Sequence, residues 1–312
     1  MILTVTLNPM LDKTVEVENL TRGRTHRATH VGMVVGGKGV NVARQLHLLG
    51  VPTVATGCWG GPVGEMLAGL LSAEGIPHDF VEVASATREG VTYREPDGTW
   101  TAIFEPPHTV TSAEADALVA KCVALFPGAR WVVCCGSSPC AATDDVYARI
   151  IGAARRAGKA SALDSYGKTF RLGVEGLPEM VKVNADEFRQ TFGGTLETDE
   201  EFRMALRRFV GRGIRSAIIT DGPRPCYATD GTDWWKIVPP PVRPVNATGS
   251  GDSMLAGFLA SLEAGESFAR ALVRGAAAGA ANAQSWEVSC ASSAGIAALE
   301  GGVLVEQRGP LQ

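Results

Sequence analysis

The sequence lacks both a long apolar run and a strong charge imbalance. No segment of its 312 residues approaches the roughly 18 unbroken apolar residues of a membrane-spanning helix. The formal net charge is −4, so nothing indicates nucleic acid or an anionic membrane as a partner. The start, Met1 to Leu7, is neither basic nor followed by a long apolar stretch, so we expect a strand there and no signal peptide.

Patterns typical of disulfide frameworks and structural zinc sites are also missing. The five histidines have no H-E-x-x-H spacing, which argues against a structural zinc site. The number of cysteines is odd, and no two have C-x-x-C spacing, so we expect reduced packing cysteines of a cytoplasmic protein. They are Cys58, Cys122, Cys134, Cys135, Cys140, Cys226 and Cys290.

What the sequence does contain is an alternation of apolar β-type runs and helical patterns. This order predicts an α/β protein with a mainly parallel sheet and helices on both faces. In such sheets ligands bind beyond the carboxyl ends of the strands, so Gly136, Asp164, Asn184 and Asp221 are expected near one cleft. We expect strands over 131–135, 160–164, 180–183 and 216–220, and helices over 144–157 and 199–212.

Two β-prone stretches without helices interrupt this alternation. In the second, Val91–Arg94 and Trp100–Phe104 flank the turn Pro96-Asp97-Gly98, which predicts a hairpin. A small antiparallel sheet with one exposed face needs a partner, so we expect a lid whose return hinge is Glu105-Pro106-Pro107. The sequence thus divides into a core of residues 1–12, 36–87 and 105–312 and a lid of residues 13–35 and 88–104.

The segment Val245–Ser253 is the most informative part of the chain. Gly249 and Gly251 let the backbone approach a ligand closely, and the following residues, from Met254, predict a buried helix. The free N–H groups of a helix N-terminus favour an anion. An anion hole of Gly249, Ser250 and Gly251 beside the carboxylate of Asp252 suits the transfer of a phosphoryl group to a hydroxyl, with Asp252 taking the proton. The alternative is a glycine turn with Asp252 as a helix N-cap.

A second glycine turn runs from Gly36 to Ala43. Gly32 to Lys38 fits G-x-x-x-x-G-K of a P-loop, but Gly39 stands where Ser or Thr should hold Mg²⁺. We interpret the segment instead as a turn that opens a helix over residues 40–49, with Lys38 and Asn41 as polar contacts to a substrate. A purely structural turn is the alternative.

The two glycine motifs, in this order, resemble those of the ribokinase-like (PfkB-type) carbohydrate kinases. Three further segments are similar to motifs of the branch that holds the 1-phosphofructokinases and tagatose-6-phosphate kinases: Thr6–Asp12, Gly136–Pro139 and Lys182–Glu187. The resemblance covers essentially the whole chain. It implies a ribokinase-like three-layer α/β core with a mainly parallel sheet plus a small β-sheet lid.

The resemblance also implies roles for single residues. Asp252 is the expected general base, and Gly249, Ser250 and Gly251 form the expected anion hole. Asn184 and Glu187 match an element that organises Mg²⁺ through water, which suits an ion that keeps most of its waters. The spacing of these two residues fits a capping box equally well. The residues expected to hold the sugar are Asp12, Gly37, Lys38 and Asn41.

A phosphorylated substrate needs cations. Arg27, Lys38 and Arg88 are the candidates, and the hydroxyl of Ser137 is a further contact. For the nucleotide, matching position suggests Thr220, Gly222, Ala247, Gly249, Gly251 and Asn282, whereas we expect Trp286 to be core. Two departures from the family concern the donor side, namely the two prolines in the loop 221–226 and Asn246 where many relatives have Asp.

The predicted function is that of an ATP- and Mg²⁺-dependent kinase of a ketohexose phosphate. Fructose 1-phosphate, giving fructose 1,6-bisphosphate, is the first choice, followed by tagatose 6-phosphate and fructose 6-phosphate. A kinase of an unphosphorylated sugar or nucleoside and a non-catalytic sugar-phosphate sensor are the alternatives. The resemblance further implies a homodimer built through the lids.

Overall fold

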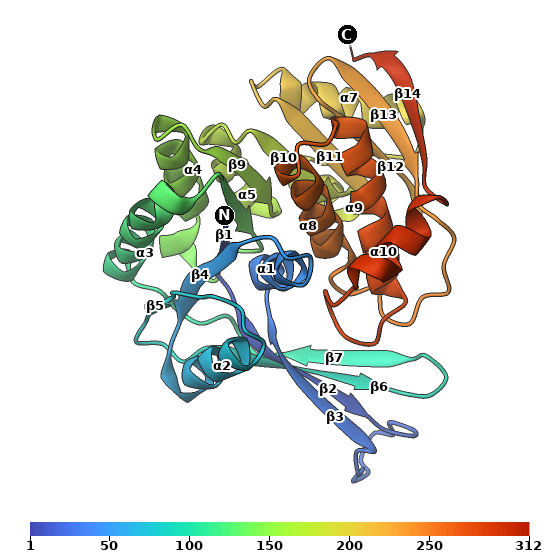
Figure 1. Ribbon diagram of the computed structural model, residues 1–312. Helices are drawn as coiled ribbons and strands as arrows, with labels where there is room; N and C mark the ends of the chain where they lie inside the picture. Colours follow the sequence, from blue (N-terminus) through green and yellow to red (C-terminus); the bar gives the residue numbers. More distant parts are fainter. Residues whose placement is uncertain (312) are drawn as a thin grey trace.

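A ten-stranded sheet forms the centre of the computed structural model, which describes residues 1–311 (Figure 1). Its strand order is β14-β13-β12-β11-β10-β9-β8-β1-β4-β5. The strands from β11 to β5 run parallel, and β12, β13 and β14 are added antiparallel at one edge. Their bounds are β1 (Ile2–Thr6), β4 (Thr53–Trp59), β5 (Val81–Glu82), β8 (Trp131–Cys135), β9 (Ala160–Asp164), β10 (Met180–Asn184), β11 (Ser216–Asp221), β12 (Arg224–Thr229), β13 (Asp233–Val238) and β14 (Leu304–Pro310).

Helices cover both faces of this sheet (Figure 1). One layer consists of α1 (Lys38–Leu48), α8 (Ser250–Glu263), α9 (Phe268–Ala283) and α10 (Ser293–Glu300). The other consists of α3 (Ser112–Leu125), α4 (Val146–Arg156), α5 (Gly167–Glu175), α6 (Ala185–Phe192) and α7 (Asp199–Val210). Because successive strand side chains point to opposite faces, Ile2 of β1 packs in the α8 layer and Leu3 in the α4 layer. The predicted three-layer α/β core is confirmed.

The small sheet has the order β3-β2-β6-β7 and lies at the end of the core where α2 (Gly61–Ala73) is found (Figure 1). Its strands are β2 (Met10–Glu16), β3 (His30–Gly36), β6 (Arg88–Arg94) and β7 (Trp100–Phe104). The hairpin β6–β7 has its turn where the sequence predicted it. The sheet is not wholly antiparallel, however, because β2 and β6 pair in parallel. Each follows a strand of the parallel core and leaves it in the same direction.

The lid strands reach closer to the core than we expected. Strand β2 begins at Met10, so Asp12 lies on the lid sheet, opposite Val34 of β3. Strand β3 ends at Gly36, and the single residue Gly37 connects it to α1. Substrate contacts from Asp12 and from the glycine turn therefore sit at the junction of lid and core.

Two predictions about loops and helix ends needed correction. The segment after β11 is a tight turn at Gly222-Pro223 rather than a loop over 221–226, and Pro225 already lies inside β12. Helix α8 begins at Ser250, so Asp252 belongs to its first turn. Within residues 1–311, no helix is long and apolar enough to cross a membrane.

Candidate active site

The site lies at the carboxyl ends of the central parallel strands. Strand β9 ends at Asp164 and β10 at Asn184, next to Thr220 of β11. The loop after β1 carries Asn8, whose Nδ2 donates to Ser137 Oγ, after β8, at 3.3 Å. This is the edge at which ligands bind in open parallel sheets, and the sequence predicted it from the strand ends.

The turn before α8 is built for a close backbone approach. Gly249 has φ 76°, a left-handed conformation in which a side chain would be strained. A Cβ there would also lie 2.5 Å from Val288 Cγ1. No side chain of the described part of the chain caps this helix N-terminus. The N–H of Ser250 donates to the backbone oxygen of Ala247 at 3.2 Å, which leaves the N–H groups of Gly249 and Gly251 for an anion.

Asn282 supports this turn from below. Its side chain is completely buried, and its Nδ2 donates to Thr248 O at 2.8 Å and to Ser250 Oγ at 3.0 Å. Its Oδ1 accepts from the backbone N–H of Ser289 at 2.6 Å. We had expected Asn282 to contact the nucleotide. In the structure it instead supports the turn Gly249–Gly251, which we call the anion turn.

Asp252 is 5% exposed and accepts a hydrogen bond of 2.8 Å from Asn41 Nδ2. Arg44 Nη1 donates to Asn41 Oδ1 at 3.2 Å, which orients the amide so that its NH₂ group faces Asp252. Burial, together with the negative charge of Asp164, raises the pKa of Asp252 to about 6, against the lowering effects of Lys38, Lys182 and the Asn41 bond. A carboxylate with such a pKa is ionised near neutral pH yet basic enough to take a proton.

Four charged side chains form a cluster beside Asp252. Asp164, with no exposed surface, lies between Lys38 Nζ (2.9 Å) and Lys182 Nζ (2.6 Å). Lys38 also contacts Glu187 at 2.5 Å. Burial by itself would raise the pKa of Asp164, but the two ammonium groups hold it below its ordinary value. Burial acts in the opposite sense on Lys38 and Lys182, yet Asp164 keeps the pKa of each lysine above its ordinary value.

Lys38 therefore lies where the sequence did not place it. We expected it beside the sugar, whereas its ammonium group joins the first turn of α1 to Asp164 and to the Asn184–Glu187 element. A Cβ on Gly251 would be 3.0 Å from Lys182 Nζ, so the second lysine lies under the anion turn. The sequence analysis missed Lys182 as a site residue, although it begins the Lys182–Glu187 motif.

Asn184 and Glu187 form a capping box at the start of α6. Asn184 Oδ1 accepts from Glu187 N at 2.8 Å, and Glu187 Oε2 accepts from Asn184 N at 3.1 Å. Within residues 1–311 there is no group of three or more His, Cys, Asp or Glu side chains that could hold a metal. Asp164 and Glu187 are already paired to Lys38. The side-chain oxygen atoms of Asn184 and Glu187 therefore fit contacts to the waters of a Mg²⁺ ion carried by a nucleotide rather than direct ligation.

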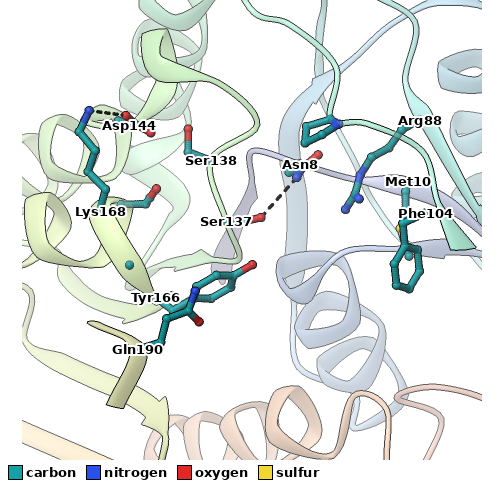
Figure 2. Close-up of a pocket in the computed structure, with 13 residues that line it drawn as sticks. Asn8, Met10, Arg88, Phe104, Ser137, Ser138, Asp144, Tyr166, Lys168 and Gln190 are labelled. Carbon is teal, nitrogen blue, oxygen red and sulfur yellow. Dashed lines mark hydrogen bonds and ion pairs between the residues drawn. The ribbon is translucent and has the colours of Figure 1, made fainter. Parts of the chain in front are cut away.

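A cavity of about 610 Å³ opens between the lid and the core (Figure 2). Arg88 and Ser137, both predicted, line it together with Asn8. Burial lowers the pKa of Arg88 somewhat, but the group stays a cation. Its Nε is buried and has no hydrogen-bond partner among the described residues, which is the state of a donor that awaits an anion.

Several lining residues escaped the sequence analysis. Met10 and Phe104 of the lid, and Tyr166, Lys168 and Gln190 of the core, surround the same cavity (Figure 2). Lys168 is paired with Asp144 at 2.8 Å and so is not a free cation. Tyr166 lies two residues beyond the end of β9, and this position at the ligand-binding edge was the one signal that could have found it.

The charge of Arg88 lowers the pKa of two neighbouring groups, Asp12 and His108. Burial raises the pKa of Asp12, whereas Arg44 and Arg88 lower it. Burial and Arg88 lower the pKa of His108 to about 4, so this ring is neutral at pH 7. Both of its ring nitrogens are buried without a partner in the part of the chain that the structure describes.

Other predicted residues lie apart from this cavity. Arg27 is exposed in the loop between β2 and β3, and Gly222 and Ala247 are exposed on the core. Thr220 is half-buried beside Asn184. The expectation that Trp286 belongs to the core was wrong, because it is only half-buried and the guanidinium of Arg94 lies over its ring.

A small sheet beside a glycine turn and a buried carboxylate is the arrangement expected of a sugar kinase of the ribokinase-like fold. The sequence matches the pfkB family of carbohydrate kinases over residues 5–293, and the chain belongs to that family. It is therefore a phosphotransferase with a sugar hydroxyl as acceptor and ATP as co-substrate.

Solved structures that resemble the chain agree with this assignment. A putative phosphofructokinase from Staphylococcus aureus is 28% identical with a TM-score of 0.84, and the match covers 99% of this chain and 100% of that one. Phosphofructokinase-2 from Escherichia coli in complex with potassium is 25% identical (TM-score 0.89, coverage 96% and 98%). A possible 1-phosphofructokinase from Thermotoga maritima is 25% identical (TM-score 0.89, coverage 98% and 99%).

The buried lysine predicts a large effect on stability. We expect Lys182→Met to lower the free energy of unfolding by about 3 kcal/mol, because Asp164 loses one of its two cations in a dry site. Urea unfolding followed by circular dichroism measures this. Arg215→Ala, which removes an exposed pair with Glu179, is the control and should cost less than about 1 kcal/mol. Equal losses in the two variants would contradict the role given to Lys182.

Proposed function

We propose that this protein is an ATP- and Mg²⁺-dependent kinase of a ketohexose phosphate, with fructose 1-phosphate as its substrate and fructose 1,6-bisphosphate as its product. The observation that carries the proposal is the environment of Asp252. It is a buried carboxylate with a raised pKa in the first turn of α8, oriented by Asn41 and adjacent to the anion turn. Those are the two parts that phosphoryl transfer to a hydroxyl requires.

In this mechanism Asp252 accepts the proton of the attacking hydroxymethyl group as its oxygen forms a bond to the γ-phosphorus. The bond from the γ-phosphorus to the bridging oxygen breaks, and ADP leaves. The N–H groups of Gly249 and Gly251 face the negative charge that the transferring phosphoryl oxygens carry. The ammonium group of Lys182 lies beneath the same turn, 3.0 Å from the position of a Cβ on Gly251. Bound Mg²⁺ would neutralise phosphate charge, and its waters would be held by Asn184 and Glu187.

The phosphosugar assignment is supported by the cation in the cavity. Arg88 presents a buried, unpartnered Nε at the lid side, and Ser137 presents a hydroxyl on the core side. A free sugar or nucleoside has no anion to satisfy this arginine. Each of the three similar structures named above is of a protein named as a phosphofructokinase, which favours a fructose phosphate over other sugars.

The lid also supports a proposal about assembly. Several large apolar side chains on it are exposed to solvent in the single chain, which is typical of a surface that another molecule covers. They are Val31 (49%), Met33 (49%), Trp100 (66%), Ile103 (63%) and Phe104 (52%). We infer a homodimer in which two lids cover each other, and a cytoplasmic protein, in keeping with seven free cysteines.

The substrate is tested by measuring ADP release with Mg-ATP and a panel of acceptors. The panel contains fructose 1-phosphate, fructose 6-phosphate, tagatose 6-phosphate, fructose, ribose and adenosine. We expect turnover confined to the phosphosugars and fastest with fructose 1-phosphate. Turnover on free sugars or adenosine alone would overturn the phosphosugar assignment. Ligand binding without any ADP release would instead support a sensor.

Asp252 is tested by its pH dependence. Protonation removes its ability to accept a proton, so kcat/KM should fall about tenfold per pH unit below a midpoint near 6 and be level above it. Asp252→Asn should lose about 10²- to 10⁴-fold in kcat and show no such midpoint. A variant with near-wild-type turnover, or one that keeps the midpoint, would refute the assigned role.

Arg88 is tested by the division of effects between KM and kcat. Removing one charge-assisted contact to a phosphate should raise the KM for the phosphosugar about 10- to 100-fold and lower kcat much less. Arg155→Ala, an exposed arginine of α4, is the control and should change neither constant. An unchanged KM for the phosphosugar in Arg88→Ala would remove this residue from the binding site.

A further inference from the structure

The lid contacts the core at a second place, away from the sugar cavity. Strand β6 carries Arg88 at its first residue and Arg94 at its last. The guanidinium carbon of Arg94 lies 3.8 Å from the ring centroid of Trp286, and Arg94 Nη2 donates to the backbone oxygen of Val245 at 2.7 Å. The ring of His30, on β3, lies edge-on to the same indole with centroids 6.5 Å apart. Two lid strands thus meet on one tryptophan.

This tryptophan is not part of the buried core. Trp286 is half-buried, and it lies in the loop between α9 and α10. A flat guanidinium over an indole is favourable because the ring face is electron-rich, with about 0.5–1 kcal/mol at exposed sites and more where water is excluded. Arg94 combines this stacking with a hydrogen bond, a pairing of contacts that lysine does not reproduce.

Both partners of Arg94, Val245 and Trp286, belong to segments that are hydrogen-bonded to each other just before the anion turn. The N–H groups of Val245 and Asn246 both donate to the backbone oxygen of Ala283, at 2.7 and 3.1 Å. Asn246 Nδ2 also donates to the backbone oxygen of Trp286 at 3.0 Å. Residues 245–246 therefore form one hydrogen-bonded unit with the loop that follows α9, and this unit runs directly into Thr248 and Gly249.

We propose that Arg94 and Trp286 form a latch between the lid and the anion turn, and that Arg94 is a positioning residue that couples phosphosugar binding to nucleotide binding. The coupling rests on the function proposed above. Strand β6 pairs with β2 along its entire length, from Arg88 to Arg94, so it responds as one rigid element. A ligand that draws Arg88 into place fixes Arg94 against Val245, and with it the turn that receives the phosphates.

Such coupling is reciprocal, and it is measurable as a ratio of dissociation constants. We expect fructose 1-phosphate to tighten the binding of Mg-AMP-PNP to the wild-type protein at least about fivefold. In Arg94→Ala and in Trp286→Leu this ratio should fall below about twofold, and the double variant should lose no more than either single one, because both remove the same contact. Isothermal titration calorimetry of Mg-AMP-PNP with and without the phosphosugar gives each ratio.

The chain offers a matched control. Arg208 lies over the ring of Phe192 at 4.1 Å in another part of the core. Arg208→Ala therefore removes a guanidinium–aromatic stack without touching the lid, and it should keep the wild-type ratio. A ratio in Arg94→Ala within twofold of the wild-type value, or a wild-type ratio near one, would overturn the coupling.

A measurement without ligand separates the latch from the substrate assignment. In the free protein, amide hydrogen exchange of residues 245–248 and 284–287 should accelerate about tenfold or more in Arg94→Ala and stay unchanged in Arg208→Ala. Unchanged exchange in Arg94→Ala would refute the latch whatever the substrate. Failure of the proposed function is visible independently, because the wild-type protein would then neither bind fructose 1-phosphate nor release ADP with it.

Discussion

The buried carboxylate of Asp164, held between two ammonium groups, is the interaction on which the rest of the site depends. It ends β9, and its partners come from β10 and from the first turn of α1. Removing a charge from water costs several kcal/mol unless it is well paired, so this carboxylate needs both lysines. Their pairing with it fixes the distance between the sheet edge and the helix that carries Asn41.

The same cluster sets the chemistry of Asp252. The charge of Asp164 and the dry surroundings raise the pKa of Asp252, while Lys38 and Lys182 lower it. The result near 6 is a balance between these effects, not a property of burial alone. The cluster thus does two things at once, because it places the ammonium group of Lys182 under the anion turn and leaves Asp252 with the basicity of a proton acceptor.

Much of this arrangement was predictable from sequence, and the reason differs from element to element. Strands β8 and β9 have their predicted bounds because a strand covered on both faces is a continuous apolar run. Asp252 was found because the glycine turn and the helix after it resemble a motif of the ribokinase-like kinases. The direction of Lys38 was not predictable, since its partners Asp164 and Glu187 lie more than a hundred residues away. The parallel pairing of β2 with β6 was not predictable either, because it also joins segments that are far apart in the sequence.

Trp286 shows where local patterns fail in a more instructive way. An indole is expected in a core because of its apolar area, yet here the area is shared between the core and a cation of the lid. Neither Arg94 nor Trp286 stands in a motif, and each looks like an ordinary surface or core residue when taken alone. Their significance comes only from the strand that joins Arg94 to Arg88. Such contacts join residues that are far apart in the sequence, and sequence spacing does not record them.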